Sequence, residues 1–314
     1  MTQKTSILIG APVDSGKARS GCIMGPDAYR VAGLPDALKA LGLHVEDAGS
    51  PALTIADSPE DLPPHLHAPA ETIAWTKAIA AAGRDAFCRG LPIFLCGDHS
   101  LSLGSLLAAS DWAATQDRPL YVLWLDAHTD FHTPQSTESG NLHGTPLGYA
   151  TGRPGFAGFP EVRHPIPPER VCFLGLRSVD PNEKSALEQT GARRYDMRTI
   201  DEQGIARPLA AFLDEVAQAN GLLHVSLDVD FLDPGFAPAV GTTVPGGATI
   251  REAHLVMEMV CDSGLMTSLD LVELNPFLDD RGRTAQVMVD LAASALGRRV
   301  FDRPTPGYRE GAQP

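Results

Sequence analysis

Short apolar runs alternate with longer amphipathic segments along most of this chain of 314 residues. The runs are apolar at nearly every position rather than at every second one, which is typical of strands that are covered on both faces. They lie at residues 5–10, 92–96, 120–125, 170–176, 222–227 and 267–271. Helices are predicted at residues 26–41, 70–89, 101–114, 205–219, 250–262 and 284–296. This alternation predicts an α/β fold in which a parallel sheet carries helices on both faces, with right-handed crossovers.

Glycine and proline are concentrated in three long connections, at residues 48–67, 151–168 and 234–247. Loops of this length in a compact domain often carry function. The chain contains no internal repeat and no low-complexity linker. It is therefore predicted to form a single domain over residues 1–314, in which the polar tail at 302–314 is expected to be frayed.

The overall charge and the cysteine content exclude several classes of protein. A net charge of −14 argues against nucleic-acid partners and anionic membranes, and it would suit a cationic substrate. No apolar stretch approaches the roughly 20 residues of a membrane span, and no signal peptide is expected. The five cysteines include no Cys-x-x-Cys pair, which indicates reduced thiols and predicts a cytoplasmic protein.

Acidic and imidazole side chains directly follow three of the predicted strands, and most are spaced two residues apart. On an extended backbone, alternate residues point to the same side. The carboxyl ends of parallel strands also meet at one edge of a sheet, where ligands bind. We therefore expect the side chains of these clusters to converge. The candidate metal ligands are His99, Asp126, His128, Asp130, Asp228 and Asp230.

The run from Asp126 through His128 to Asp130 is the most specific of these clusters. Two carboxylates so close to an apolar strand repel each other unless a cation neutralises them. Six ligands exceed what one ion with an open position requires, so a pair of ions is predicted. Many carboxylates without thiolates favour Mn²⁺ over structural zinc. Two such ions about 3.5–4 Å apart would share a water and lower its pKa, which predicts a two-metal hydrolase.

Asp228 and Asp230 alone would allow another interpretation. An Asp-x-Asp pair after a strand can hold the metal of a nucleotide-sugar transferase or cap the next element. That hypothesis leaves His99 and the cluster at 126–130 without a role. Asp98 is interpreted as structural, and it could orient His99 from behind.

Two further groups extend the predicted site. His143 lies in a polar, glycine-containing loop at 131–144, and the usual histidine pKa suits proton transfer near neutrality, although a histidine of a turn is an alternative. Glu273 follows an apolar strand and needs a cation, which could be a metal, an arginine or a charged substrate. Asp270 could equally be the residue that faces outward. The remaining histidines are expected at the surface or in the core: His44, His65, His67, His164, His224 and His254.

Together these motifs resemble the arginase branch of the ureohydrolase family. The similarity runs from about residue 5 to residue 300 and includes residues 21–26 and 241–247. The Ser-Gly-Asn-Leu-His-Gly loop at 139–144 resembles arginases more than agmatinases. The other matching pieces are Gly97-Asp98-His99-Ser100, Asp126-Ala127-His128-Thr129-Asp130, Ser226-Leu227-Asp228-Val229-Asp230 and Glu273-Leu274-Asn275-Pro276.

The resemblance implies a three-layer α/β/α sandwich with a mainly parallel eight-stranded sheet and two Mn²⁺ ions per subunit. It implies hydrolysis of L-arginine to L-ornithine and urea by a homo-oligomer, a trimer or a hexamer. By resemblance, one ion would be bound by His99, Asp126, Asp130 and Asp228. The other ion would be bound by Asp126, His128, Asp228 and Asp230.

The resemblance also implies roles around the ions. Asp130 would hold the bridging hydroxide, His143 would transfer protons and Glu273 would receive the guanidinium group. The residues that would contact the rest of the substrate are Ser139 and Asn141 at the α-carboxylate, Asp180 at the α-amino group, and Thr242 and Glu183 in the pocket wall.

Three positions depart from the usual arginase pattern. Cys96 stands where the family usually has glycine, His132 where it has an asparagine that contacts the substrate carboxylate, and Ser178 where it has an aspartate. His132 could still donate a hydrogen bond, whereas Ser178 removes one anion from the amino-group side. Two alternatives therefore stay open: a ureohydrolase that acts on a related guanidino compound, as agmatinases and guanidinobutyrases do, and a metal-binding protein without catalysis.

Overall fold

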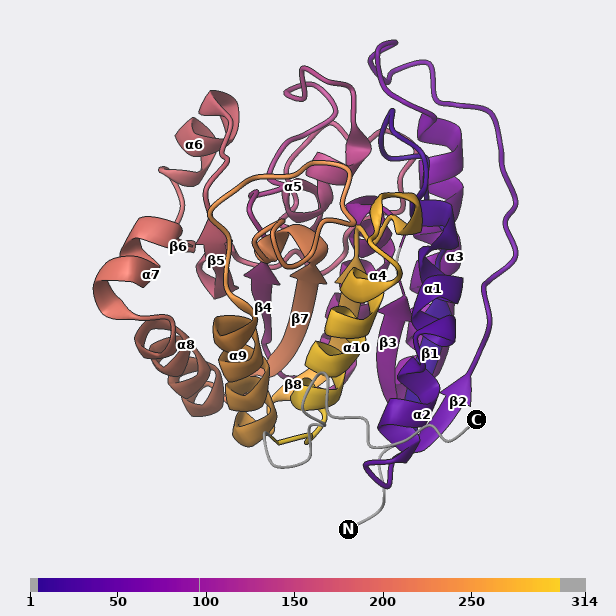
Figure 1. The fold of residues 1–314 in the computed structure, drawn as a ribbon. Coiled ribbons are helices and arrows are strands. Elements are labelled where there is room, and N and C mark those ends of the chain that lie inside the picture. Colours follow the sequence, from indigo (N-terminus) through magenta and orange to yellow (C-terminus); the bar gives the residue numbers. More distant parts are fainter. Residues whose placement is uncertain (1–4, 96, 300–314) are drawn as a thin grey trace.

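The structure is a computed structural model that describes residues 5–95 and 97–299. Within these ranges, eight strands form one parallel sheet in the order β2-β1-β3-β8-β7-β4-β5-β6 (Figure 1). The predicted eight-stranded α/β fold is therefore confirmed. The strands are β1 (Thr5–Gly10), β2 (His44–Asp47), β3 (Leu91–Leu95), β4 (Leu120–Leu125), β5 (Val171–Leu176), β6 (Arg193–Asp196), β7 (Leu222–Asp228) and β8 (Met266–Val272).

Helices cover both faces of this sheet and complete the three layers (Figure 1). Most of them connect one parallel strand to another. The α-helices of the described ranges are α1 (Gly25–Val31), α2 (Leu34–Lys39), α3 (Pro69–Arg89), α4 (Ser102–Thr115), α5 (Pro146–Ala150), α6 (Pro181–Leu187), α7 (Met197–Gln203), α8 (Ala206–Gln218), α9 (Ile250–Ser263) and α10 (Arg283–Ala295).

The core lies on both sides of the central strands. Leu123 and Val225 belong to the cluster that packs under α8, α9 and α10, whereas Val122 and Phe94 face the side of α3 and α4. Each fully buried side chain of this size stabilises the fold by about 1.5–3 kcal/mol. Burial on both faces explains why these strands are apolar at every position rather than at alternate ones.

The single helix predicted at residues 26–41 is wrong, because the chain forms two helices there. The break is at Gly33, which has a φ of +88°, in the left-handed region that favours glycine. Pro35 then lies in the first turn of α2, where its missing N–H is tolerated. The apolar periodicity continues across the break, so periodicity alone does not reveal it.

The prediction missed the two edge strands, β2 and β6, and the short helices α5, α6 and α7. Both edge strands are only four residues long, rich in charge and half-buried at most. The three helices have five to seven residues, too few to show a helical period. The departure at Cys96 and the tail at 302–314 lie outside the described residues. In the described part of the chain, no helix has the length and apolar character that a membrane span requires.

The sheet order decides where the polar clusters meet. The strands β3, β8, β7 and β4 are consecutive neighbours at its centre, and all run in the same direction. Their carboxyl ends therefore lie together, on the side where the irregular connections gather in Figure 1. Open parallel sheets bind ligands beyond this edge.

Candidate metal centre and substrate pocket

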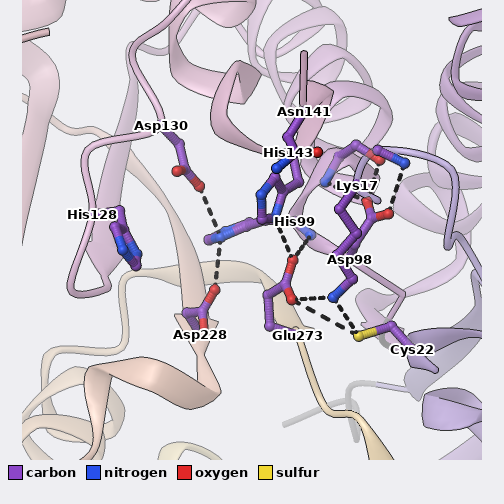
Figure 2. A network of polar contacts seen from close by, with 12 residues as sticks. Lys17, Cys22, Asp98, His99, His128, Asp130, Asn141, His143, Asp228 and Glu273 are labelled. Carbon is purple, nitrogen blue, oxygen red and sulfur yellow. Dashed lines mark hydrogen bonds and ion pairs between the residues drawn. The ribbon is translucent and has the colours of Figure 1, made fainter. Parts of the chain in front are cut away.

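His99 lies at the centre of the first group of ligand candidates. It begins the 3₁₀ turn His99–Leu101 just after β3, and Asp98 caps that turn through the backbone N–H of Ser100. Nδ1 of the imidazole lies 3.0 to 3.1 Å from one oxygen of each of three carboxylates: Asp126, Asp130 and Asp228. Figure 2 shows Asp130 and Asp228 on opposite sides of the ring. Four side chains from three central strand ends therefore point at one position.

His128 lies at the centre of a second group beside the first. Its Nδ1 is 3.0 Å from Oδ2 of Asp230 and 3.3 Å from Oδ1 of Asp126. Asp126 therefore belongs to both groups. One carboxylate shared by two sets of ligands is the arrangement that a pair of neighbouring cations requires.

The backbone reaches this arrangement in a different way from the one predicted. The chain bends at residues 126–128 instead of continuing as an extended strand, and Asp130 has a φ of +45°. Such strain in a residue other than glycine is commonly found at functional sites. The side chains converge because one oxygen of Asp126 accepts the N–H of His128 at 2.7 Å, and one oxygen of Asp228 accepts the N–H of Asp230 at 2.7 Å. The second oxygen of each carboxylate is thereby directed at the cluster.

The cluster fits divalent cations. Nδ1 of His99 and Oδ2 of Asp126 are buried without a hydrogen-bond partner among the described residues, although they lie only 3.1 Å apart. Buried polar atoms rarely stay unsatisfied. Burial and the neighbouring Asp126 raise the pKa of Asp130 to about 6, and burial with Asp230 raises the pKa of Asp228. Asp130 and Asp228 are therefore short of positive charge, which metal ions would supply.

Glu273 and His143 border the metal-ligand cluster. Glu273 follows β8 with a φ of +65°, and its Oε1 accepts the backbone N–H of His99 at 2.8 Å. Nδ1 of His143 contacts the same oxygen at 2.9 Å (Figure 2). Burial would raise the pKa of Glu273, but Lys17 and His143 hold it well below the usual range. Glu273 is thus a buried, charged carboxylate beside the cluster.

Sequence reasoning missed Lys17. Its Nζ lies 2.5 Å from Oε2 of Glu273 and 2.9 Å from Sγ of Cys22, and the side chain is buried. The partners Lys17 and Glu273 are 256 positions apart, so no local spacing could indicate the pair. The one available signal was that Lys17 precedes the family-like segment at 21–26.

A cavity of about 260 Å³ opens over these groups. It brings together every residue that the sequence predicted for the site. Besides the six ligand candidates, its wall includes His132, Thr137, Ser139, Asn141, His143, Ser178, Asp180, Glu183, Thr242 and Glu273. Thr137 also lines the cavity, although the sequence analysis did not predict it as a site residue.

At the outer part of the pocket, His132 contacts an acidic pair. Its Nε2 lies 3.1 Å from Oδ2 of Asp180 and 3.6 Å from Oε2 of Glu183. Both acids are also tied to α6, because they form the capping box at its amino end. Glu183 is buried and accepts the N–H of Phe131, whereas the Asp180 side chain is 66% exposed. Asp180 is therefore the more accessible of the two.

Asp270 and the remaining histidines lie outside the pocket. Asp270 points into the core, where its Oδ2 accepts hydrogen bonds from Ser102 and Ser105. His224 and His254 are buried as well, whereas His44 and His164 are exposed. Glu273, rather than Asp270, is the acid of this strand that faces the site.

The model of the arginase family matches residues 4–297. The chain belongs to the arginase family. An arginase from Brucella melitensis is 58% identical over 303 residues, which cover 96% of this chain and 99% of that protein. An arginase from Bacillus caldovelox is 37% identical over 301 residues, which cover 94% of this chain and 98% of that protein. The crystal structure of an arginase from Bacillus subtilis superposes with a TM-score of 0.85 at 35% identity, over 95% of this chain and 99% of that one. The resemblance inferred from the motifs is thus confirmed.

Proposed function

We propose that this chain hydrolyses the guanidinium group of L-arginine to give L-ornithine and urea, with two Mn²⁺ ions bound in the cluster around His99 and His128. The observation that carries the proposal is the pair of ligand groups that share Asp126, next to the buried Glu273, in one cavity. Membership of the arginase family and relatives named arginase support it.

Six side chains would hold the ions. His99, Asp126, Asp130 and Asp228 would bind one ion, and Asp126, His128, Asp228 and Asp230 the other. When bound, the two ions would supply a water of lowered pKa as the nucleophile near neutral pH. The abundance of carboxylates and the absence of thiolate ligands favour Mn²⁺ over structural zinc.

Residues of the pocket would bind and orient the substrate. A guanidinium group stays protonated at any working pH, so Glu273 would bind it as a charged partner. Asp130 would accept a hydrogen bond from the attacking water. His143, held by Glu273 at Nδ1, would deliver a proton to the departing amine.

The outer residues would bind the amino-acid end of the substrate. Ser139 and Asn141 would contact the α-carboxylate, and Asp180, with Glu183 and Thr242 nearby, the α-ammonium group. Oδ1 of Asn141 already accepts the N–H of Ala18 at 3.1 Å, so its amide would donate from Nδ2. His132 would also border this end of the pocket.

A second candidate is the hydrolysis of a guanidino acid that lacks the α-amino group, such as 4-guanidinobutyrate. One observation favours it: His132 already contacts Asp180 at 3.1 Å, where the α-ammonium group would bind. Ser178 places no further anion on that side. Asp180→Ala would then leave the turnover of the preferred substrate unchanged.

The test is a substrate panel with metal-depleted protein that is reloaded with Mn²⁺, Co²⁺, Ni²⁺ or Zn²⁺. Urea should be released from L-arginine, should disappear on chelation and should return best with Mn²⁺. Preferred turnover of agmatine or 4-guanidinobutyrate would make the substrate assignment wrong. His128→Ala and Asp228→Asn should lose bound metal, and full activity without metal would contradict the reaction class.

We also propose a homo-oligomer of three or six chains, one domain per chain and a cytoplasmic location. Family resemblance supports the oligomer, and the single continuous sheet supports one domain per chain. The scattered cysteines of the sequence, with no Cys-x-x-Cys pair, support the cytoplasmic location. Light scattering after size exclusion would measure the number of chains.

A further inference from the structure

The loop that carries Lys17 is held in place on both sides of this residue. The N–H of Gly16 donates to Oδ2 of Asp98 at 2.8 Å, and the carbonyl of Gly16 accepts the N–H of His143 at 2.9 Å. On the other side, the N–H of Ala18 donates to Asn141 at 3.1 Å. A Cβ atom at position 16 would lie 2.7 Å from an oxygen of Asp98, so glycine is required for this close approach. The backbone of Lys17 is thus fixed against the pocket wall.

The ammonium group of Lys17 meets Glu273 from behind. Figure 2 shows Glu273 between Lys17 and Cys22 on one side and the cluster of His128, Asp130 and Asp228 on the other. Glu273 lines the cavity, whereas Lys17 and Cys22 are not among the described residues of its wall. Lys17 therefore contacts Oε2 of Glu273 without occupying the space where a substrate would bind.

The contact is costly to build, which argues that it has a role. A buried ammonium group loses several kcal/mol of hydration unless a partner compensates for the loss. Burial alone would lower the pKa of Lys17, but Glu273, Cys22 and Asp98 outweigh it and raise the pKa above the usual lysine value. Lys17 is thus a permanent cation at the back of Glu273.

Four groups contact the carboxylate of Glu273 and together fix its orientation, the weakest being the thiol of Cys22 at 3.8 Å from Oε2. Oε1 accepts the N–H of His99 and contacts His143, and Oε2 contacts Lys17. Without Lys17, Oε2 would be held only by the long contact of 3.8 Å from the thiol of Cys22, so the carboxylate would be oriented less firmly. A carboxylate that must bind a planar guanidinium group depends on such orientation.

We propose that Lys17 is a positioning residue for Glu273, whose carboxylate it holds oriented toward the cavity, and that it thereby sets the preference of the site for a cationic guanidinium group over a neutral ureido group of the same shape. This inference rests on the proposed function, in which Glu273 binds the guanidinium group. It deepens that function by naming the residue on which the recognition of charge depends.

The test compares L-arginine with L-citrulline, which keeps the amino-acid end and the chain length but carries a neutral ureido group. KM for L-arginine and the inhibition constant of L-citrulline would be measured for the wild type, Lys17→Gln and Lys17→Met. The exposed Lys39 of α2 provides the matched control, Lys39→Gln. Bound Mn²⁺ and the melting temperature would be measured for each variant.

Both neutral variants of Lys17 should raise KM for L-arginine at least tenfold and change the inhibition constant of L-citrulline less than twofold. Lys39→Gln should change neither, and Lys17→Arg, which keeps the charge, should recover part of the preference. An unchanged or lower KM for L-arginine in the Lys17 variants would overturn the proposal. Lys17 would then have no effect on substrate binding, or it would weaken binding by competing with the substrate for Glu273. Equal losses for both ligands, or variants that fail to fold or to bind Mn²⁺, would make Lys17 a purely structural residue.

A failure of the proposed function would be visible separately. If the wild type released no urea from L-arginine, that function would be wrong. Calorimetric binding of L-arginine and L-citrulline to the same proteins, with no turnover to interfere, would then test Lys17. A ratio of the two affinities that stayed the same in Lys17→Gln would still overturn the role of Lys17.

Discussion

The imidazole of His99 stacks on the indole of Trp124, with ring centroids 4.2 Å apart and planes inclined by 6°. Trp124 lies in β4, two residues before Asp126, and is fully buried. On its other edge, Nε2 of His99 lies 2.9 Å from Oγ of Ser226. These two neighbours, rather than Asp98, orient the ring, and they leave Nδ1 facing the carboxylates.

Ser226→Ala is therefore expected to weaken metal binding without removing a ligand. The hydroxyl contacts Nε2 and helps to hold the orientation of the His99 ring, and the loss of such a partner typically costs 10- to 100-fold in metal affinity. Competition with a fluorescent chelator would measure the affinity. Ser263→Ala, on the surface end of α9, is the control, and an unchanged affinity in Ser226→Ala would mean that stacking on Trp124 alone holds the ring.

Metal removal should lower the stability of the whole chain. Four buried carboxylates surround two imidazoles, and ions that bind only the folded state stabilise it by about 2.7 kcal/mol at 100 times the dissociation constant. We expect Mn²⁺ to raise the melting temperature by several degrees in a concentration-dependent way. Calorimetry with and without a chelator would measure the shift. The shift should be much smaller in Asp228→Asn. A wild-type melting temperature that does not change with Mn²⁺ would contradict the proposal that the cluster binds cations.

His132→Asn should improve the binding of L-arginine. The imidazole of His132 contacts Oδ2 of Asp180, the oxygen that the substrate ammonium group would need. A partly exposed contact of this kind is worth about 0.4–1 kcal/mol, so its removal should lower KM roughly two- to fivefold with little change in kcat. Steady-state kinetics would measure both constants. A higher KM would mean that His132 itself binds the substrate.

The parts of the fold that the sequence predicted are those that depend on local composition. Leu120–Leu125 is apolar throughout because both of its faces are covered, and that pattern is readable without a structure. The edge strands β2 and β6 lack it because water covers part of them. Contacts between residues that are far apart in the sequence produce no such local pattern. Lys17 with Glu273, and His132 with Asp180, are joined by tertiary structure alone.

The same limit applies to Asp270, whose direction the sequence left open. Its buried carboxylate binds Ser102 and Ser105 of α4, and Nε2 of His224 lies 3.2 Å away. Asp270→Ala would leave these donors unsatisfied, so it should cost about 2–4 kcal/mol. Urea denaturation would measure the loss. Asp201→Ala, at an exposed site of α7, should cost much less, and equal losses would show that the buried network contributes nothing of its own.

Asp290 should make the stability depend on pH. It lies on α10, where Oδ1 accepts a hydrogen bond from Arg298 at 2.7 Å and Oδ2 is 3.5 Å from His254 of α9. Burial would raise the pKa of Asp290, but His254 and Arg298 outweigh it and lower the pKa below the usual value. An acid with a lowered folded-state pKa stabilises the fold above its unfolded pKa of about 3.9, and this contribution is lost as the pH falls through the folded pKa.

Asp290→Asn is thus expected to cost about 0.5–1 kcal/mol at pH 7, a value reduced because the carboxylate is one-third exposed. The difference from the wild type should stay constant between pH 7 and pH 5, since Asp290 is ionised in both states there, and should shrink below pH 4. Urea midpoints at several pH values would measure it. Asp57→Asn, in the exposed loop at 48–67, should show no such trend. A difference that grew as the pH fell would mean that burial, rather than the contacts with Arg298 and His254, dominates at Asp290.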